Sequence, residues 1–123
     1  MGTTPDDRRQ HARVPLSFDL EGAREPGGVL ARMVARDLSL GGLYCTSTTD
    51  FPEMTRLAVR LNLPAMPGTG PYGVEPVDVE AVVVRRAAAG SVGGGRRFEL
   101  ALYFTSMTRD DREKIARFIA RGA

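Results

Sequence analysis

Apolar and polar residues alternate along most of the chain between residues 16 and 104. A period of two is typical of β-strands that bury one face and expose the other. The pattern occurs in six segments, at residues 16–20, 29–36, 43–47, 57–63, 77–84 and 98–104. The positions expected to face a core are Leu16, Phe18 and Leu20, then Val29, Ala31, Met33 and Ala35, then Leu57, Val59, Leu61 and Leu63, then Val77, Val79, Ala81 and Val83, and finally Phe98, Leu100, Leu102 and Phe104.

Turn-forming residues lie between these segments. Residues 25–28 read Glu-Pro-Gly-Gly, which suits a tight connection between the first two strands. Residues 64–76 contain four prolines and three glycines, which predicts a long surface loop. The glycine-rich residues 90–95 are expected to link the last two strands.

The pattern becomes helical near the C-terminus. Thr108 is a suitable N-cap, and acidic residues follow it, where they favour the positive end of a helix. Ile115, Phe118 and Ile119 recur at spacings of three and four, so they form an apolar stripe that we expect to pack on the strands. Two i,i+4 ion pairs are expected along the helix, Asp110–Lys114 and Glu113–Arg117.

Six antiparallel strands and one helix predict a small β-barrel. Closure buries one face of every strand and removes most of the unpaired edges, and the helix would then cover an open end or one flank. At 123 residues we expect a single domain. It would consist of a flexible arginine-rich arm at residues 1–13, the barrel at residues 14–107 and the helix at residues 108–121.

The charge of the chain is nearly balanced, with 17 basic and 15 acidic residues and a net charge of +2. This total is too small to predict bulk binding to nucleic acid, so no nucleic-acid partner is expected. No apolar run approaches the length of a membrane span, and no signal-peptide core follows Met1. We therefore expect a cytoplasmic protein without membrane insertion.

The sequence predicts a binding protein rather than an enzyme. His11 is the only histidine, which excludes histidine-based triads and multi-histidine metal sites. Cys45 is the only cysteine, and its place in an apolar–polar alternation predicts a small buried side chain. The glycine-rich residues 91–95 lack the lysine and threonine of a phosphate-binding loop. No metal and no cofactor are expected.

Three arginines, Arg8, Arg9 and Arg13, gather just before the first predicted strand. Arg9 and Arg13 are four residues apart, so both can reach one ligand from a helical turn or from one side of an extended arm. Guanidinium groups bind phosphate in a bidentate manner, and they also pair with guanine or stack on it. Without an anion the charges repel one another, so we expect the arm to be disordered in the free protein.

Residues 36–42, Arg-Asp-Leu-Ser-Leu-Gly-Gly, connect the second predicted strand to the third. The segment suits a tight turn, in which short polar side chains bond to the backbone and glycine takes positive φ angles. It also suits a guanine nucleotide. An aspartate accepts hydrogen bonds from the guanine N1–H and amino group, a serine hydroxyl donates or accepts, and a glycine lets a bulky ligand approach the backbone. The segment alone fits both interpretations.

Taken together, the two segments resemble the motifs of PilZ domains. Residues 9–13 fit the RxxxR motif and residues 37–42 fit the (D/N)xSxxG motif, in the family's order and at a similar separation. Residues 107–112, followed by an amphipathic helix, are also similar to the family's C-terminus, so the resemblance extends from Asp7 to Ile119. PilZ domains are bacterial receptors for cyclic di-GMP. The resemblance implies their fold, a six-stranded antiparallel β-barrel with a C-terminal helix.

The resemblance also implies a role for each motif residue. The arginines of the arm would grip phosphates and guanine. The aspartate and the serine would hold a guanine on the barrel surface, where the glycine would leave room for it. The implied ligand-binding residues are Arg8, Arg9, Arg13, Asp37, Ser39 and Gly42.

The implied function is that of a cyclic di-GMP receptor or adaptor. Ligand would order the arm and present a changed surface to an unidentified downstream protein, regulating motility, exopolysaccharide or biofilm behaviour. One alternative is a PilZ-like protein-interaction adaptor, for example in type IV pilus function, that does not bind nucleotide. Another is a small barrel that binds single-stranded nucleic acid through arginine and aromatic stacking.

Overall fold

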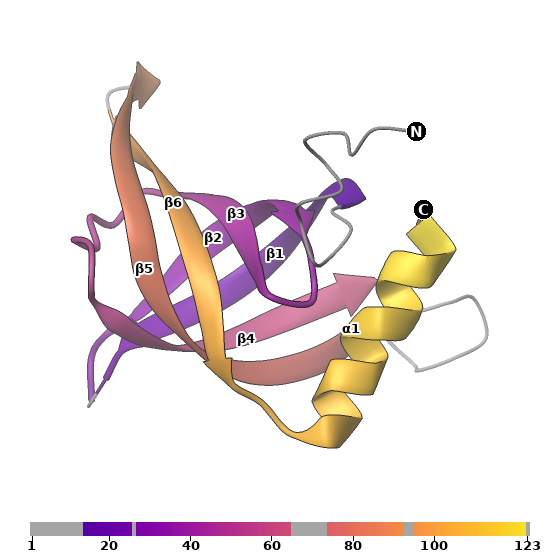
Figure 1. The fold of residues 1–123 in the computed structure, drawn as a ribbon. Coiled ribbons are helices and arrows are strands. Elements are labelled where there is room, and N and C mark those ends of the chain that lie inside the picture. Colours follow the sequence, from indigo (N-terminus) through magenta and orange to yellow (C-terminus); the bar gives the residue numbers. More distant parts are fainter. Residues whose placement is uncertain (1–13, 26, 65–73, 93–94, 123) are drawn as a thin grey trace, which may run out of the picture.

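The computed structural model describes residues 14–25, 27–64, 74–92 and 95–122. Within these ranges, six antiparallel strands close into a barrel in the order β1-β2-β3-β6-β5-β4, and one helix follows (Figure 1). The predicted fold class is confirmed. The elements are β1 (Val14–Arg24), β2 (Leu30–Leu38), β3 (Gly42–Ser47), β4 (Arg56–Pro64), β5 (Val74–Val92), β6 (Gly95–Ser106) and α1 (Arg109–Gly122).

The barrel interior contains the apolar residues that the alternation predicts. Of the predicted inward positions, those with a described side chain are at most 7% exposed, with one exception. Val29 is 88% exposed, because it precedes β2, whose pairing with β1 begins at Leu30. The prediction is therefore wrong for Val29. Leu16 lies outside the described side chains.

β5 begins earlier than the sequence predicts. It starts at Val74 and includes Pro76, which lies opposite Asn62 of β4. Proline is tolerated at this position because β6 pairs with β5 only from Glu80 onward, so Pro76 lies on a free edge of the sheet. The loop predicted at residues 64–76 is therefore shorter than expected.

The hairpin between β5 and β6 is also longer than predicted. β5 continues to Val92 and β6 resumes at Gly95, although residues 90–95 were expected to form the link. The pairing shifts register between Val83 and Arg85 and again between Ala88 and Ser91. These irregularities interrupt the strict alternation, which explains why the sequence pattern did not reveal the full length of the strands.

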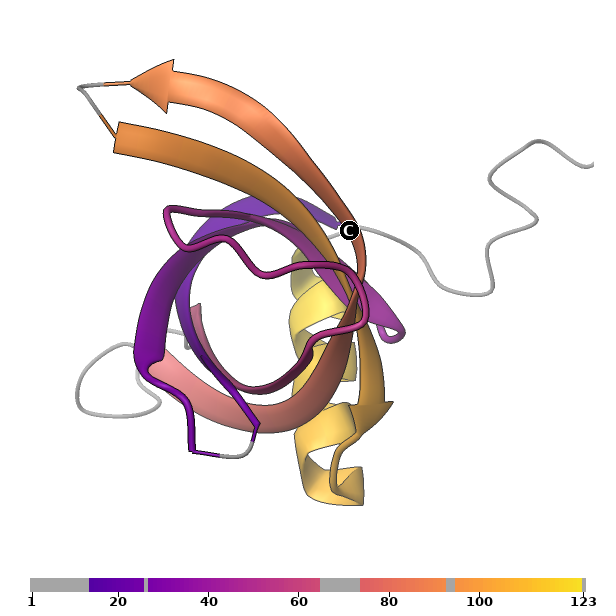
Figure 2. The same ribbon diagram turned by 90° about the vertical axis from the view of Figure 1, so that its left-hand side faces the viewer.

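α1 lies across one end of the barrel (Figures 1 and 2). The Thr108 hydroxyl accepts a hydrogen bond from the Asp111 N–H at 3.0 Å, which confirms the predicted cap. Ile115 is fully buried, and Phe118 meets Phe18 of β1 edge to face with ring centroids 6.1 Å apart. The apolar stripe of α1 therefore packs on the strands, as predicted.

The ion pairs of α1 are only partly as predicted. Lys114 pairs with Asp110 at 3.5 Å. The expected Glu113–Arg117 pair is replaced by a contact of 3.9 Å between Arg117 and Glu75 of β5. Sequence spacing could not anticipate this partner, because Glu75 comes near the helix only through the tertiary fold.

The Cys45 thiol is buried in the barrel, as predicted. Burial raises its pKa to about 12, and the nearby Asp37 charge acts in the same direction. We expect no reaction with a thiol reagent at pH 8 in the folded protein and rapid labelling in urea. Because the thiol of the unfolded chain has an ordinary pKa of 9.0, the free energy of unfolding should fall as the pH rises above that value. Rapid labelling without urea would contradict a closed barrel.

Candidate functional site

A β-bulge in β2 places Asp37 on the outer surface. Ala35 pairs with Cys45 and Asp37 pairs with Tyr44, so β2 carries an extra residue, Arg36, at this point. In a regular strand Asp37 would share the inward face of Ala35, because side chains alternate with a period of two. The bulge turns it outward. Its Oδ1 atom accepts a hydrogen bond from the Tyr44 N–H at 3.2 Å.

The N-terminal arm joins the barrel beside Asp37. Val14, the first residue of β1, pairs with Leu38, and Pro15 pairs with Asp37. Arg8, Arg9 and Arg13 lie outside the described residues. Arg13 is nevertheless covalently bonded to Val14, and consecutive Cα atoms are about 3.8 Å apart. The register therefore brings the attachment point of the arm next to the predicted guanine-binding carboxylate.

Ser39 is buried and organises the turn between β2 and β3. Its hydroxyl accepts hydrogen bonds from the N–H groups of Gly41 and Gly42 and donates to the Gly42 carbonyl, each at 3.2 Å. A serine hydroxyl has one donor and two acceptor positions, so all of them are engaged here. Its predicted contact with guanine is not tested by this geometry.

Gly42 has a structural reason to lack a side chain. A Cβ atom at this position would overlap the backbone carbonyl oxygen of Leu102 in β6, well inside the 3.0 Å that real Cβ atoms respect. The positive φ angles expected for glycine in this turn are absent from Gly41 and Gly42, since the described glycines with positive φ are Gly27 and Gly90. Close approach to β6, rather than backbone conformation, requires glycine. That Gly42 also leaves room for a ligand stays a prediction.

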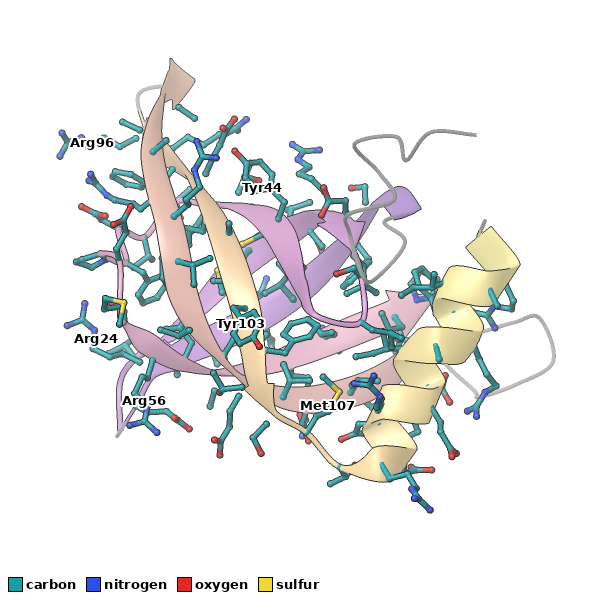
Figure 3. The ribbon with its side chains drawn as sticks, viewed as in Figure 1. Arg24, Tyr44, Arg56, Arg96, Tyr103 and Met107 are labelled. Atoms are coloured by element: carbon teal, nitrogen blue, oxygen red, sulfur yellow. The ribbon has the colours of Figure 1, made fainter. Side chains whose placement is uncertain are left out.

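A row of outward residues extends from Asp37 across the sheet. Tyr44 pairs with Ala101 of β6, and Ala101 pairs with Arg85 of β5. The Tyr44 hydroxyl donates to Glu99 at 2.8 Å. This bond raises the pKa of Tyr44, and burial and the Glu99 charge act in the same direction. Figure 3 shows Tyr44 on the outer side of β3.

The consecutive residues Arg85 and Arg86 lie in two different environments. Arg85 lies on the outward row. Arg86 forms two hydrogen bonds with Asp50, at 2.6 and 2.7 Å, and its guanidinium lies 5.0 Å from the centroid of the Phe98 ring. The Asp50 pairing lowers the pKa of that carboxyl group. Arg86 therefore adds little free positive charge beside the site.

The sequence model of the PilZ domain matches residues 7–121. The chain belongs to the PilZ domain family. No curated protein sequence matches it.

Solved structures of other proteins, one of them a PilZ domain, share the fold. The PilZ domain of YcgR from Escherichia coli, described with c-di-GMP, superposes with a TM-score of 0.64 at 20% identity and covers 94% of this chain and 91% of that one. MotI/DgrA of Bacillus subtilis, an inhibitor of motility, gives 0.70 at 20% identity over 93% of this chain and 50% of that one. The MrkH–c-di-GMP complex of K. pneumonia gives 0.69 at 18% identity over 93% and 51%. This PilZ chain thus spans about half the length of MotI/DgrA and MrkH.

Sequence reasoning did not single out Tyr44 as a neighbour of the PilZ motif. Tyr44 alternates with the inward Leu43 and Cys45, a signal that it faces outward. The position of Arg85 depends on the β5–β6 register, which the sequence does not contain. Within the described ranges, no group of three or more His, Cys, Asp or Glu side chains could hold a metal, and no helix is long and apolar enough to cross a membrane.

Proposed function

We propose that this PilZ domain is a receptor for cyclic di-GMP. Arg9 and Arg13 of the arm would grip phosphates and guanine, with help from Arg8, while Asp37 accepts hydrogen bonds from the guanine edge. The observation that carries the proposal is the register that pairs Val14 and Pro15 with Leu38 and Asp37, since it joins the arm to the barrel at the carboxylate.

The bulge in β2 supports the role of Asp37. Guanine presents two adjacent donors, N1–H and the exocyclic amine, which suit a carboxylate, whereas the corresponding edge of adenine offers a single donor. PilZ relatives described with c-di-GMP, YcgR and MrkH, have the same fold. In this proposal Ser39 and Gly42 act partly through the turn that they shape, which holds the outer surface next to Asp37.

The proposed output is an altered surface rather than catalysis. Ligand phosphates would remove the repulsion between the arginines and draw the arm over the barrel, which is a transition from disorder to order. The new surface would be recognised by a downstream protein in the cytoplasm that controls motility, exopolysaccharide or biofilm behaviour. Ligand can drive this change only through contacts that the open arm does not make.

The hydrogen bonds of Ser39 within the turn and the close approach of β6 to Gly42 favour a second candidate function. Because the turn itself requires both residues, they would be retained even in an adaptor that binds only protein, for example in type IV pilus function. Calorimetric titration of the full chain with cyclic di-GMP distinguishes the two. Saturable binding supports the receptor, and no heat at high ligand concentration supports the adaptor.

Asp37→Ala is expected to weaken cyclic di-GMP binding and to reduce the preference over cyclic di-AMP. A site built on specific hydrogen bonds discriminates strongly, because the wrong base leaves buried polar groups unpaired. Titrations of both ligands on the wild type and the variant measure the effect. Asp110→Ala, which removes an exposed carboxylate at the start of α1, serves as the control and should bind normally. Equal affinity of the wild type for the two ligands would remove Asp37 from the site.

A further inference from the structure

Tyr44 lies directly beside the carboxylate proposed to bind guanine. The bulge at Arg36 makes Asp37 of β2 the direct partner of Tyr44 of β3 on the outer side of the barrel. Side chains directly opposite each other on antiparallel strands have Cβ atoms about 4.5–5.5 Å apart. A purine whose edge reaches the Asp37 carboxylate therefore has its rings close to the ring of Tyr44.

A hydrogen bond holds the Tyr44 ring along the sheet. Tyr44 pairs with Ala101 of β6, but its hydroxyl donates to Glu99 at 2.8 Å. Glu99 lies two residues before Ala101, so both face the same side of β6. To reach Glu99, the ring must extend from β3 toward β6 past the small side chain of Ala101. Tyr44 is half-buried in this position, as expected when one ring face lies on the sheet and the other faces outward.

The outward face of the Tyr44 ring carries no stacking partner within the described part of the chain. Arginine side chains lie over the rings of Phe98 and Phe118. Neither a guanidinium group nor another ring lies in this way on Tyr44 in the ranges that the structure describes. An aromatic ring with a fixed orientation and an open face is a surface on which a nucleotide base stacks.

The charges around Tyr44 favour a base over a phosphate at this place. The hydrogen bond to Glu99 and burial raise the pKa of the Tyr44 hydroxyl, the charges of Glu99 and Asp37 act in the same direction, and the charge of Arg85 opposes them. Both carboxylates are therefore near enough to repel an anionic group. Guanine is neutral and presents hydrogen-bond donors to a carboxylate, so the base is the part of the ligand that suits the surface over Tyr44.

We propose that Tyr44 is a stacking platform for a guanine of cyclic di-GMP and that Glu99 holds this platform in position. The role rests on the proposed receptor function, and it falls to two residues outside the RxxxR and (D/N)xSxxG motifs. Asp37 binds the edge of the base, and Tyr44 supports its face. Stacking tolerates every base, because each has a π face, so Tyr44 contributes affinity without choosing between guanine and adenine.

Calorimetric titrations of the full chain with cyclic di-GMP and cyclic di-AMP test the platform. Tyr44→Leu should weaken the binding of both ligands by the same factor, roughly 5- to 150-fold, the range for a lost base–aromatic stack. The preference for guanine should stay unchanged, whereas Asp37→Ala should reduce it. A loss confined to cyclic di-GMP would mean that Tyr44 acts only by placing Asp37, and it would overturn the platform.

The variants Tyr44→Phe and Glu99→Ala test the support that Glu99 gives. Each removes the hydrogen bond and leaves the ring, so each should weaken binding by only about 2- to 10-fold, the cost of fixing a freed side chain. The double variant should lose no more than either single variant, because both changes remove the same bond. Glu99→Gln keeps an acceptor and should recover most of the affinity that Glu99→Ala loses. Additive losses would overturn the supporting role of Glu99.

Tyr103→Leu is the matched control. Tyr103 is 56% exposed on β6 and pairs with Gly42 and Val82 instead of Asp37. Figure 3 shows the two tyrosines apart on the barrel. Neither is fully buried, so both leucine variants should fold, which thermal unfolding verifies, and Tyr103→Leu should bind like the wild type. Wild-type affinity in Tyr44→Leu, or equal losses at the two tyrosines, would overturn the platform and leave the receptor function intact. A wild type that binds no cyclic di-GMP would overturn both.

Discussion

Replacing Gly42 with alanine is expected to destabilise the protein by about 3 kcal/mol, at the upper end for overpacking a core. The added Cβ would overlap the Leu102 carbonyl oxygen, which belongs to the backbone of β6 and cannot rotate away. Relief would require β3 and β6 to separate, and their pairing from Gly42 to Ser47 closes the barrel. Urea unfolding monitored by circular dichroism measures the change in the free energy of unfolding.

Gly22→Ala provides a matched control within β1. Its Cβ would meet the terminal methyl group of Met33, the end of a flexible side chain that can move, so we expect a cost of about 1 kcal/mol. Equal stability losses at Gly22 and Gly42 would contradict the backbone clash. A Gly42→Ala protein as stable as the wild type that fails to bind cyclic di-GMP would instead assign Gly42 to the ligand.

Arg9→Ala and Arg13→Ala should each weaken cyclic di-GMP binding by roughly 2–3 kcal/mol, or about 30- to 150-fold, the scale of a lost charge-assisted hydrogen bond. We expect little change in stability, because neither arginine is among the core positions that the alternation predicts. Calorimetric titration and thermal unfolding of the same samples separate these quantities. Arg109 is exposed at the start of α1. The variant Arg109→Ala is therefore the control for the loss of one positive charge and should bind normally. Wild-type affinity in either arm variant would remove that arginine from the site.

The alternation of apolar and polar residues predicted the barrel, because a strand that buries only one face carries apolar side chains at every second position. The predicted core positions of β4, such as Leu57 and Leu63, are buried without exception. The far ends of β5 and β6 could not be predicted, since register shifts near Arg85 and Gly90 break the period of two. Residues beyond those shifts look like a loop although they pair as strands.

The site was predictable in its residue types but not in its geometry. The outward direction of Asp37 depends on the bulge at Arg36, which is visible only when β2 is paired with β3. Gly42 appeared to belong to a turn or a ligand pocket, but the Leu102 backbone that requires it lies on β6, far away in the chain. Contacts between distant strands leave no local signal, so the sequence could not reveal this reason for the glycine.

The strand order has a consequence for how the protein is made. β6 lies between β3 and β5 in the barrel. Gly42 of β3 pairs with Tyr103 of β6, and about half of the chain separates these two residues. During synthesis the arm and Asp37 leave the ribosome early, but β3 keeps an open edge until the last strand arrives. Such long-range pairing folds slowly and exposes edges that can join other chains. The outer row from Asp37 to Arg85 is complete only after β6 docks, so nascent chains should require protection from aggregation until then.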